Sequence, residues 1–417
     1  MKVLEITNVD FSLRHFLLPL MRGIRARGHE VVGVCADGPL LAVVRAEGFR
    51  VAALPFARSL SPMAQARAFR TLLALLRAEK PDLVHGHMPI SGFLARLAAR
   101  VAGVPRVAYT CHGFLFNQPG PWWRRALAFA MEWTGGRLTD VFLTVSAEEA
   151  GNARRWWIAR GAKAVGNGRD PARFHPDLVA RAAIRRELGT AEGTVVVVAV
   201  SRLVRHKGYP ELLAAMADVD AELWVVGERL ASDHGEDMEP YFVRAGLGAR
   251  LKRLGYREDV PAILAAADIF ALPSHFEGLP MSIIEAMLTG LPVVATNVRG
   301  PREQVIEGET GLLVPPADSA GLAKALQLLC SPSPLAGEGW GEGGQGKSRD
   351  MSENLNSTKQ GAAATPHPSL GLLRSPSPQG EREYSLRSRM GRAGRIRALA
   401  QYDEARVVAR TLDLLGL

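Results

Sequence analysis

The sequence is poor in cysteine and has no long apolar run. Its three cysteines, Cys35, Cys111 and Cys330, fit neither a disulfide framework nor a metal cluster in number or spacing. We therefore expect a reducing, cytosolic compartment. No segment approaches the roughly 18 consecutive apolar residues of a membrane span, so a role at a membrane would be peripheral. The first residues, MKVLEITNV, predict a short strand and not a signal peptide.

Aromatic residues are also scarce, at 6% of the chain, and acidic residues are outnumbered by basic ones. Lys and Arg total 51 against 42 Asp and Glu, which gives a net charge of +9. This balance is compatible with nucleic acid, an anionic membrane surface or a phosphorylated ligand. The length of 417 residues and a hydrophobic content of 47% predict about two globular domains.

Strands and helices alternate through the first half of the chain. Such alternation predicts βαβ units, that is, a parallel sheet with helices on both faces. Ligands of such sheets bind beyond the carboxyl ends of the strands. We therefore expect a Rossmann-like domain over 1–165, with one rim formed by residues 8–10, 85–87 and 111–113. Its strands are predicted at 2–7, 30–35, 50–54, 82–85, 106–110 and 141–145.

The pattern restarts after a connector rich in Gly, Pro and Asp. Residues 166–177 read GNGRDPARFHPD, which is typical of an interdomain segment. A second doubly wound α/β domain is predicted over 178–330, beginning with a strand at 194–201 and including a helix over 240–251. Two such domains in tandem leave a cleft between them, the usual place for a ligand.

Residues 331–384 break the pattern with Gly, Pro, Ser and polar residues and no hydrophobic period. Such a segment cannot bury enough apolar surface to offset its ordering entropy, so we predict a disordered insertion in a surface loop. SPSPLAGEG near its start is echoed by SPSPQGERE near its end, which indicates a translated inverted-repeat DNA element. A partner-binding linker is the alternative. Helical sequence resumes over 385–417.

Two basic residues follow the first strand of the second domain. Arg202 ends that strand and Lys207 precedes the next helix, so both should lie at a rim beside free backbone N–H groups. Two cations with such donors suit a diphosphate, and two solvated surface cations are the alternative. Gly227 ends the next strand, where a backbone without a side chain can approach a ligand closely.

Two carboxylates eight residues apart lie in FALPSHFEGLPMSIIEAMLTG, residues 270–290. Pro280 favours the first turn of a helix and Gly290 suits its end. Glu277 should therefore lie in the preceding loop, and Glu285 about one turn inside the helix. Cations for phosphates and carboxylates for hydroxyls on one rim together indicate a nucleotide sugar. A surface loop with two solvated acids is the simpler alternative.

These segments resemble the retaining glycosyltransferases of family 4, which have the GT-B fold. The resemblance is carried by SRLVRHKGYPELLAAM, GYREDVPAILAAADIFALPSHFEGLPMSIIEAMLTGLPVVAT and ETGLLVPPAD, and in the first half by PDLVHGHMPISGFLARLAAR, YTCHGFLF and VGNGRDPARFHP. It implies two Rossmann-like domains facing across a cleft, with helices in 385–417 closing the second domain and returning to the first. It extends to the branch that acts on polyprenyl-diphosphate-linked sugars in capsule, exopolysaccharide or O-antigen synthesis.

The resemblance implies a role for each motif residue. Within the family's E-x7-E motif, Glu277 would hold the donor sugar hydroxyls and Glu285 the nucleotide ribose. Arg202 and Lys207 would neutralise the diphosphate, and His112 would reach the sugar near the acceptor. No metal or other cofactor is expected. The backbone that would hold sugar and phosphate oxygens is that of Gly278, Leu279 and Pro280.

Two loops depart from the family pattern. A Gly-Gly pair usually follows the first strand, but residues 8–12 of this chain read NVDFS. Gly-Asp-Gly-Pro usually follows a later strand, and residues 227–230 read GERL. These departures leave open the contacts of the first loop to the leaving group and the form of the base pocket.

The acceptor side is predicted in GFLFNQPGPWWRRALAFAMEWTGGR, where aromatic and basic residues are interleaved. Trp122, Trp123, Arg124 and Arg125 suit an anionic membrane interface, and RRWW at 154–157 adds a second cluster. A packed helix with solvated arginines is the alternative. No nucleic-acid partner is expected, because no recognised binding module accompanies these residues.

With these features, the resemblance implies a metal-independent retaining glycosyltransferase, which we expect to be cytoplasmic and peripheral on the inner face of the cell membrane. It would move a hexosyl or N-acetylhexosaminyl group from a nucleotide sugar, expected to be UDP-linked, to a lipid-linked or glycan acceptor. A UDP-sugar 2-epimerase-like enzyme and an inactive sugar-binding homologue disrupted by the insertion are the alternatives. His85 and His87 are not expected to bind a metal, because they are two residues apart at a strand end and no Cys or carboxylate ligand is expected near them.

Overall fold

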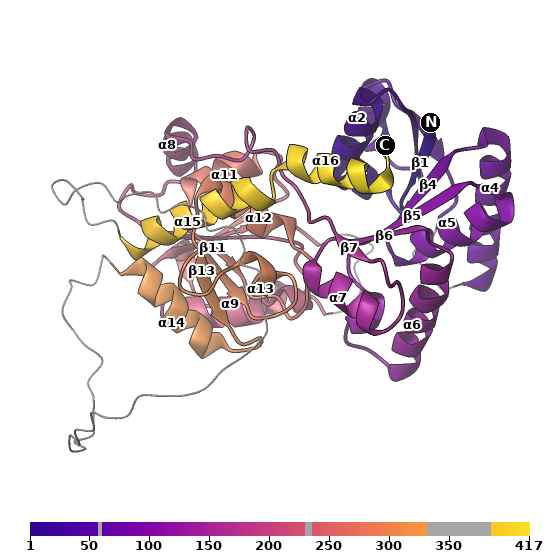
Figure 1. Ribbon diagram of the computed structural model, residues 1–417. Coiled ribbons are helices and arrows are strands. Elements are labelled where there is room, and N and C mark those ends of the chain that lie inside the picture. Colours follow the sequence, from indigo (N-terminus) through magenta and orange to yellow (C-terminus); the bar gives the residue numbers. More distant parts are fainter. Residues whose placement is uncertain (57–60, 230–235, 332–384) are drawn as a thin grey trace, which may run out of the picture.

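The protein consists of two α/β domains, which lie side by side in Figure 1. The first domain is drawn in indigo to magenta and the second in pink to orange. Apart from Ser331, the insertion predicted at 331–384 lies outside the described residues, as does Leu230 of the GERL loop. The computed structural model describes residues 1–56, 61–229, 236–331 and 385–417.

The first domain is built on a seven-stranded parallel sheet with the order β3-β2-β1-β4-β5-β6-β7. Alternate residues of a strand face opposite sides of a sheet. In β1, Val3 therefore packs with one core cluster, whereas Leu4 and Ile6 pack with another. The strands are β1 (Lys2–Ile6), β2 (Glu30–Cys35), β3 (Arg50–Ala53), β4 (Leu83–His87), β5 (Arg106–Cys111), β6 (Val141–Thr144) and β7 (Lys163–Ala164).

Helices cover both faces of this sheet. Residues of α2 and α3 pack with Val3, and residues of α4 and α5 pack with Leu4 on the other face. Two short helical turns, α1 (Asp10–Ser12) and η1 (Leu13–Leu17), occupy the NVDFS loop after β1. The longer helices are α2 (Leu18–Ala26), α3 (Leu41–Ala46), α4 (Pro62–Glu79), α5 (Pro89–Ala102), α6 (Trp122–Arg137) and α7 (Ala147–Arg155).

The second domain has a six-stranded parallel sheet with the order β10-β9-β8-β11-β12-β13. Its strands are β8 (Val196–Val200), β9 (Glu222–Val226), β10 (Leu251–Gly255), β11 (Ile269–Leu272), β12 (Val293–Thr296) and β13 (Gly311–Val314). Its helices are α8 (Leu178–Glu187), α9 (Tyr209–Met216), α10 (Glu239–Arg244), α11 (Val260–Ala266), α12 (Met281–Thr289), α13 (Pro301–Gln304) and α14 (Ser319–Cys330).

The helix predicted over 240–251 is wrong in its second half. The helix α10 ends at Arg244, and the chain then passes through Gly246 and Gly248 with φ of 62° and 55°. A left-handed backbone interrupts a helix, and glycine adopts it without steric penalty. The chain continues through the short turn η4 (Gly248–Arg250) into β10, the edge strand next to β9.

The two C-terminal helices join the domains. The helix α15 (Leu386–Gln401) packs on α12 of the second domain, with Met390 and Ala398 buried. The next helix, α16 (Glu404–Leu415), packs on α2 of the first domain through Leu412. Figure 1 shows the pair in yellow, running from the second domain to the first.

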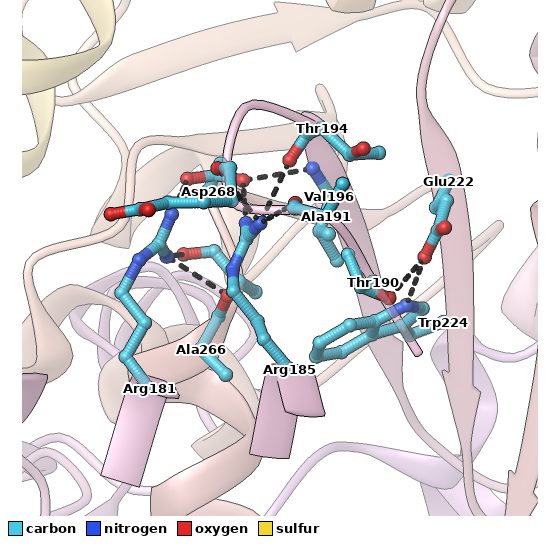
Figure 2. A network of polar contacts seen from close by, with 12 residues as sticks. Arg181, Arg185, Thr190, Ala191, Thr194, Val196, Glu222, Trp224, Ala266 and Asp268 are labelled. Carbon is cyan, nitrogen blue, oxygen red and sulfur yellow. Dashed lines mark hydrogen bonds and ion pairs between the residues drawn. The ribbon is translucent and has the colours of Figure 1, made fainter. Parts of the chain in front are cut away.

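A polar network fixes α8 at the start of the second domain (Figure 2). Asp268 Oδ2 accepts from Arg185 Nη2 at 2.6 Å and from the Val196 backbone N–H at 2.9 Å. Arg181 Nη2 donates to the other Asp268 oxygen at 2.8 Å. Both arginines also donate to backbone carbonyls. These contacts satisfy the donors of the Arg185 side chain, which is almost fully buried. The network joins α8 to the first strand of the sheet and plays no part in the cleft.

Candidate active site

The loop between β11 and α12 places Glu277 at the mouth of a helix. β11 is apolar and fully buried, and α12 begins directly after Pro280, whose backbone is extended. Gly290 ends the helix in the left-handed conformation, with φ of 86°. Glu277 therefore lies in the loop before α12 and Glu285 lies inside the helix, as predicted from the proline and glycine positions.

Lys207 and Glu277 form an ion pair across 70 residues of sequence. Lys207 Nζ lies 2.6 Å from Glu277 Oε1, and Ser274 Oγ donates to the same oxygen at 2.7 Å. Lys207 belongs to η3 (Arg205–Lys207), the turn that follows β8. The two side chains are 14% and 11% exposed, so the pair is shielded from much of the solvent screening that weakens surface ion pairs.

A cleft of about 630 Å³ lies between the domains and contains this ion pair. Its volume is in the range of small-molecule sites, roughly 300–1,000 Å³. The first domain contributes residues at the ends of β5 and at the start of α7, and the second contributes the loops after β8, β11 and β12. The predicted site residues that the structure brings together here are His112, Arg202, Lys207, Glu277 and Gly278.

Glu285 is not among the residues that line this cleft. Arg169 Nε, from the interdomain connector, donates to Glu285 Oε1 at 2.6 Å. The same guanidinium donates through Nη1 to the His15 carbonyl at 3.0 Å, so it joins α12 to the first domain. In this conformation Glu285 is a partner of the connector, and its predicted ribose contact stays a prediction.

Three further predicted residues lie beside the cleft without lining it. Gly227 has φ of 125° and packs against the Ser201 carbonyl, where a side chain would clash. The Leu279 carbonyl accepts from Asn167 Nδ2 at 2.7 Å, and the Pro280 carbonyl accepts from Gln304 Nε2 at 2.9 Å. These contacts make Leu279 and Pro280 parts of the scaffold around the helix mouth.

Gly278 allows the two domains to touch. A Cβ atom at Gly278 would lie 2.5 Å from the His112 carbonyl oxygen and 3.7 Å from the Cα of Gly113. Because Cβ atoms do not approach backbone oxygens so closely, a larger residue at 278 would separate the domains. Glycine therefore permits the backbone contact that brings His112 beside Glu277.

Charged residues hold the same two edges together. Glu148 at the start of α7 accepts from Arg299 Nε at 2.9 Å and from Arg302 Nε at 3.0 Å. In return, Glu303 of α13 accepts from the Ala147 backbone N–H at 2.8 Å. An acid at a helix N-terminus is favoured by the free N–H groups there. The domains thus meet through complementary charges at the cleft edge.

Glu149 was not singled out from the sequence, yet it lines the cleft. Its Oε1 accepts from the Phe114 backbone N–H at 3.0 Å, and its Oε2 is buried with no hydrogen-bond partner among the described residues. Burial raises the pKa of this carboxyl to about 7, although the Phe114 hydrogen bond and Arg299 oppose the rise. The S-x-x-E spacing from Ser146, which caps α7, is the signal that could have placed it in the first turn.

The chain matches known glycosyltransferases over both domains. The model described as Glycosyltransferase Family 4 matches residues 15–173, and that described as Glycosyl transferases group 1 matches residues 194–331. The chain is 30% identical over 285 residues to the UDP-Gal:alpha-D-GlcNAc-diphosphoundecaprenol alpha-1,3-galactosyltransferase of Escherichia coli, across 64% of this chain and 71% of that protein. The chain belongs to glycosyltransferase family 4.

Further comparisons agree with this assignment. The glycosyltransferase is 24% identical over 353 residues to the N,N'-diacetylbacillosaminyl-diphospho-undecaprenol alpha-1,3-N-acetylgalactosaminyltransferase of Campylobacter jejuni, across 80% of this chain and 91% of that protein. Its fold is similar to that of Alr3699/HepE of Anabaena, solved in complex with UDP, with a TM-score of 0.74, 19% identity and coverage of 100% and 99%. The predicted GT-B fold and enzyme class are confirmed.

The environment of His85 and His87 in the glycosyltransferase differs from the one expected. Glu5, in the strand β1, contacts both rings, with His85 Nδ1 at 3.0 Å and His87 Nε2 at 2.7 Å from its two oxygens. The expectation that no carboxylate lies near these histidines was therefore wrong. It failed because β1 and β4 are neighbours in the sheet although about eighty residues separate them in sequence.

Large apolar side chains of the glycosyltransferase are exposed along α6. Trp122 is 78% exposed and Trp123 is 49% exposed, and the Arg124 guanidinium lies 5.0 Å from the Trp123 ring centre. Arg125 is also exposed, and its Nε donates to the Phe116 carbonyl at 3.0 Å. Across the described residues, every helix is too short or too polar to span a membrane.

Proposed function

We propose that this glycosyltransferase moves a hexosyl or N-acetylhexosaminyl group from a UDP-sugar to a lipid-linked or glycan acceptor, with retention of anomeric configuration, in cell-surface polysaccharide synthesis. The observation that carries the proposal is the cleft in which Lys207 and Glu277 of one domain face His112 of the other. Support comes from the similar enzymes of E. coli and C. jejuni, whose names specify diphosphoundecaprenol-linked acceptors.

The second domain suits the donor. Arg202 and Lys207 bring two positive charges to the cleft, where the leaving diphosphate develops negative charge. Lys207 Nζ carries three protons, and the hydrogen bond to Glu277 uses one of them. The remaining two are available to phosphate oxygens, while the Glu277 carboxylate accepts from sugar hydroxyls. In this arrangement the protein supplies the charge stabilisation that a metal ion would otherwise provide.

Retention requires that the new bond forms on the face from which the old one leaves. In the proposed step the bond between the anomeric carbon and the β-phosphate oxygen breaks, and both electrons go to that oxygen. The acceptor oxygen bonds to the same face of the anomeric carbon, and its proton passes to the departing phosphate. Glu277 is not assigned as a covalent nucleophile, because its proposed role is to hold the sugar hydroxyls.

The exposed tryptophans of α6 support a peripheral membrane position. An indole ring suits the boundary between lipid headgroups and acyl chains, and nearby arginines are attracted to anionic lipids. We call the surface formed by Trp122, Trp123 and Arg124 the Trp face. It belongs to the first domain, the one that contributes His112 and Glu149 to the cleft. A protein docked by this face would bring its acceptor side to a lipid-linked substrate.

A two-part assay tests the proposed function. The full chain is incubated with a panel of nucleotide sugars, first alone and then with a polyprenyl-diphosphate-linked sugar in vesicles. The proposal predicts transfer that depends on the acceptor, a UDP donor and a product with retained configuration. Formation of a 2-epimer without acceptor would favour the epimerase. Binding of UDP without either reaction would instead favour an inactive homologue.

A further inference from the structure

Five polar side chains from three neighbouring strands form one hydrogen-bonded chain beneath the cleft. Glu5 comes from β1, His85 and His87 from β4, and Thr110 and His112 from β5 and the residue after it. Glu5 and His85 are directly paired across the sheet, as are His87 and Thr110. Four of the five are almost completely buried, whereas His112 lines the cleft. A buried chain of this kind needs every polar atom satisfied.

The contacts run from Glu5 in two directions. Glu5 Oε1 lies 3.0 Å from His85 Nδ1, and His85 Nε2 lies 2.8 Å from Thr110 Oγ1. Glu5 Oε2 lies 2.7 Å from His87 Nε2, and His87 Nδ1 lies 3.2 Å from His112 Nε2. His112 is therefore two hydrogen bonds away from a carboxylate that is fully enclosed in the first domain.

Charge fixes the direction of the hydrogen bonds that join Glu5, His87 and His112. Burial by itself would raise the pKa of Glu5, but His85 and His87 outweigh it and hold that pKa at about 2. Burial and neighbouring His85 lower the pKa of His87 to about 4, and burial and His87 lower that of His112 to about 3. At neutral pH, Glu5 is therefore an acceptor alone, while His87 and His112 are neutral rings with one N–H each.

One arrangement of protons satisfies these conditions. His87 must donate from Nε2 to Glu5, which leaves its Nδ1 without a proton. His87 Nδ1 then accepts from His112 Nε2, and this leaves His112 Nδ1 as a hydrogen-bond acceptor. The carboxylate at Glu5 thus determines which nitrogen of a cleft residue can accept, through one intervening ring.

We propose that Glu5 and His87 are positioning residues that hold His112 in its Nε2–H form, so that His112 Nδ1 accepts a hydrogen bond from a hydroxyl of the bound sugar. This inference rests on the proposed glycosyl transfer. His112 is the residue that touches substrate, and Glu5 acts through His87. The sugar hydroxyl keeps its proton throughout, because His112 orients the ring and takes no part in the bonds that break and form.

The first test removes the charge at Glu5 without changing its shape. The variant Glu5→Gln presents one acceptor and one donor in place of two acceptors, so one of the two histidine bonds must reverse. We expect imidazole nitrogen NMR shifts to show His112 moving from the Nε2–H form to the Nδ1–H form or a mixture. We also expect kcat to fall about tenfold or more, because a misplaced catalytic contact costs up to about 100-fold. UDP affinity should stay within about twofold, since the diphosphate cations lie in the other domain.

A matched control is available in the same domain. Glu132 is 2% exposed and also accepts two buried hydrogen bonds, from Tyr109 Oη at 2.8 Å and Arg96 Nη2 at 3.1 Å. We expect Glu132→Gln to lower stability while leaving the His112 form and kcat unchanged. An equal loss of kcat in both variants, without a change at His112, would overturn the proposal.

A second variant keeps the test decisive if Glu5→Gln does not fold. In His87→Leu, the acceptor for His112 Nε2 is lost, so nothing holds His112 in its Nε2–H form. We expect the same change at His112 and a similar fall in kcat, with no further fall when both substitutions are combined. An unchanged His112 spectrum in either folded variant contradicts the positioning role, whether or not transfer is detected. Absence of transfer by the parent protein would contradict the proposed function alone.

A bound metal would produce a different result. Glu5, His85 and His87 bring potential ligand atoms within 4.8 Å of one another. Those atoms, however, already form hydrogen bonds with each other. Elemental analysis of the purified full chain is expected to find less than about 0.1 zinc per chain, because a zinc site needs its histidine nitrogens free of such protons. Stoichiometric zinc that is lost in Glu5→Gln would contradict the hydrogen-bonded chain and show that these residues form a metal site.

Discussion

Lys207 Nζ lies 2.6 Å from Glu277 Oε1, and a nearly identical pair lies elsewhere in the same domain. Lys252 Nζ is 2.8 Å from Glu222 Oε2, with side chains 18% and 15% exposed against 14% and 11% for the first pair. The first pair lines the cleft, whereas the second contacts Thr190 and Trp224. The Lys252–Glu222 pair therefore serves as a control for the Lys207–Glu277 pair, because loss of either removes a comparable electrostatic contact.

Glu149→Gln should stabilise the protein in a pH-dependent way. The folded pKa of about 7 exceeds the ordinary value of 4.5, so the fold favours the protonated carboxyl. Below pH 4.5 the carboxyl is protonated in both the folded and the unfolded state, so Glu149 does not lower the free energy of unfolding. This destabilisation grows between pH 4.5 and 7, and above pH 7 it reaches about 3 kcal/mol. Denaturation at pH 5 and pH 8 should show a gain for Glu149→Gln that is larger at pH 8. An equal gain at both values would contradict the raised pKa. Groups facing the carboxyl are Arg299, Glu303, Glu132 and Cys111.

The neighbouring substitution Glu148→Gln should change the stability of the protein in the opposite direction. Burial would raise the pKa of Glu148, but Arg302 and Arg299 outweigh burial and lower it. The stability from these contacts is present above the unfolded pKa and is lost as the pH falls through the folded value. Replacement should therefore destabilise the protein at pH 8 and have little effect in strong acid. A stabilising effect at pH 8 would show that the interdomain contacts with Arg299 and Arg302 are not net favourable.

Gly278→Ala should impair the chemistry without unfolding either domain. The added methyl group would lie 2.5 Å from the His112 carbonyl, so the domains must separate slightly. We expect kcat to fall about tenfold or more because His112 moves away from the bound sugar, whereas the melting temperature and UDP affinity change little. Gly193→Ala is the control, since its Cβ would meet no atom within 4 Å and its φ is not positive. Full activity of Gly278→Ala would mean that this domain contact is dispensable.

Replacement of the Trp face should reduce binding to anionic vesicles. The double variant Trp122→Ala/Arg124→Ala removes the most exposed indole of α6 and a nearby cation. Co-sedimentation with vesicles containing anionic lipid should fall about tenfold or more, since an interfacial arginine contributes about 1 kcal/mol and the indole adds apolar contact. Val243→Ala, at a side chain 73% exposed in the second domain, should leave binding unchanged. Unchanged partitioning of the double variant would sink the membrane proposal.

Replacing residues 332–384 with a short Gly-Ser linker should preserve folding and activity. Cys330 at the end of α14 and Leu386 at the start of α15 pack against the same core cluster, so a short connection can join them. Loop length alters the closure free energy only logarithmically, by about 0.6 kcal/mol per doubling. Transfer rates should therefore agree within about twofold. An inactive parent with an active shortened variant would instead support the inactive-homologue alternative.

Local sequence patterns were sufficient to predict the ends of α12 and the residues at the carboxyl edge of the second sheet. Pro280 and Gly290 placed the ends of α12, because proline fixes its own backbone and glycine accepts the left-handed conformation. Arg202, Lys207 and Glu277 each follow a strand of one parallel sheet, and the carboxyl ends of such strands meet at one edge. Their convergence in the cleft was therefore predictable from the order of elements.

Contacts between distant segments were not predictable in the same way. Glu285 pairs with Arg169 because the connector crosses over α12, and no local pattern reports where a connector runs. Glu5 pairs with two histidines through strand adjacency, although a single acid inside the apolar strand KVLEI was a visible sign of a buried partner. The Glu149 carboxyl accepts a hydrogen bond from the Phe114 backbone N–H and does not cap its own helix, and this contact depends on tertiary packing.

The most direct test of the donor site compares Glu277→Gln and Lys207→Ala with Glu222→Gln and Lys252→Ala. The measurement is the rate of sugar transfer from a UDP-sugar to a polyprenyl-diphosphate-linked acceptor as a function of donor concentration, in parallel with UDP affinity. We predict that both cleft variants lose about 100-fold in kcat/KM, consistent with removal of one preorganised contact to the reacting groups. The matched variants should retain the parent rate. Equal rates for Lys207→Ala, Glu277→Gln and the parent would contradict the assignment of this ion pair to the donor site.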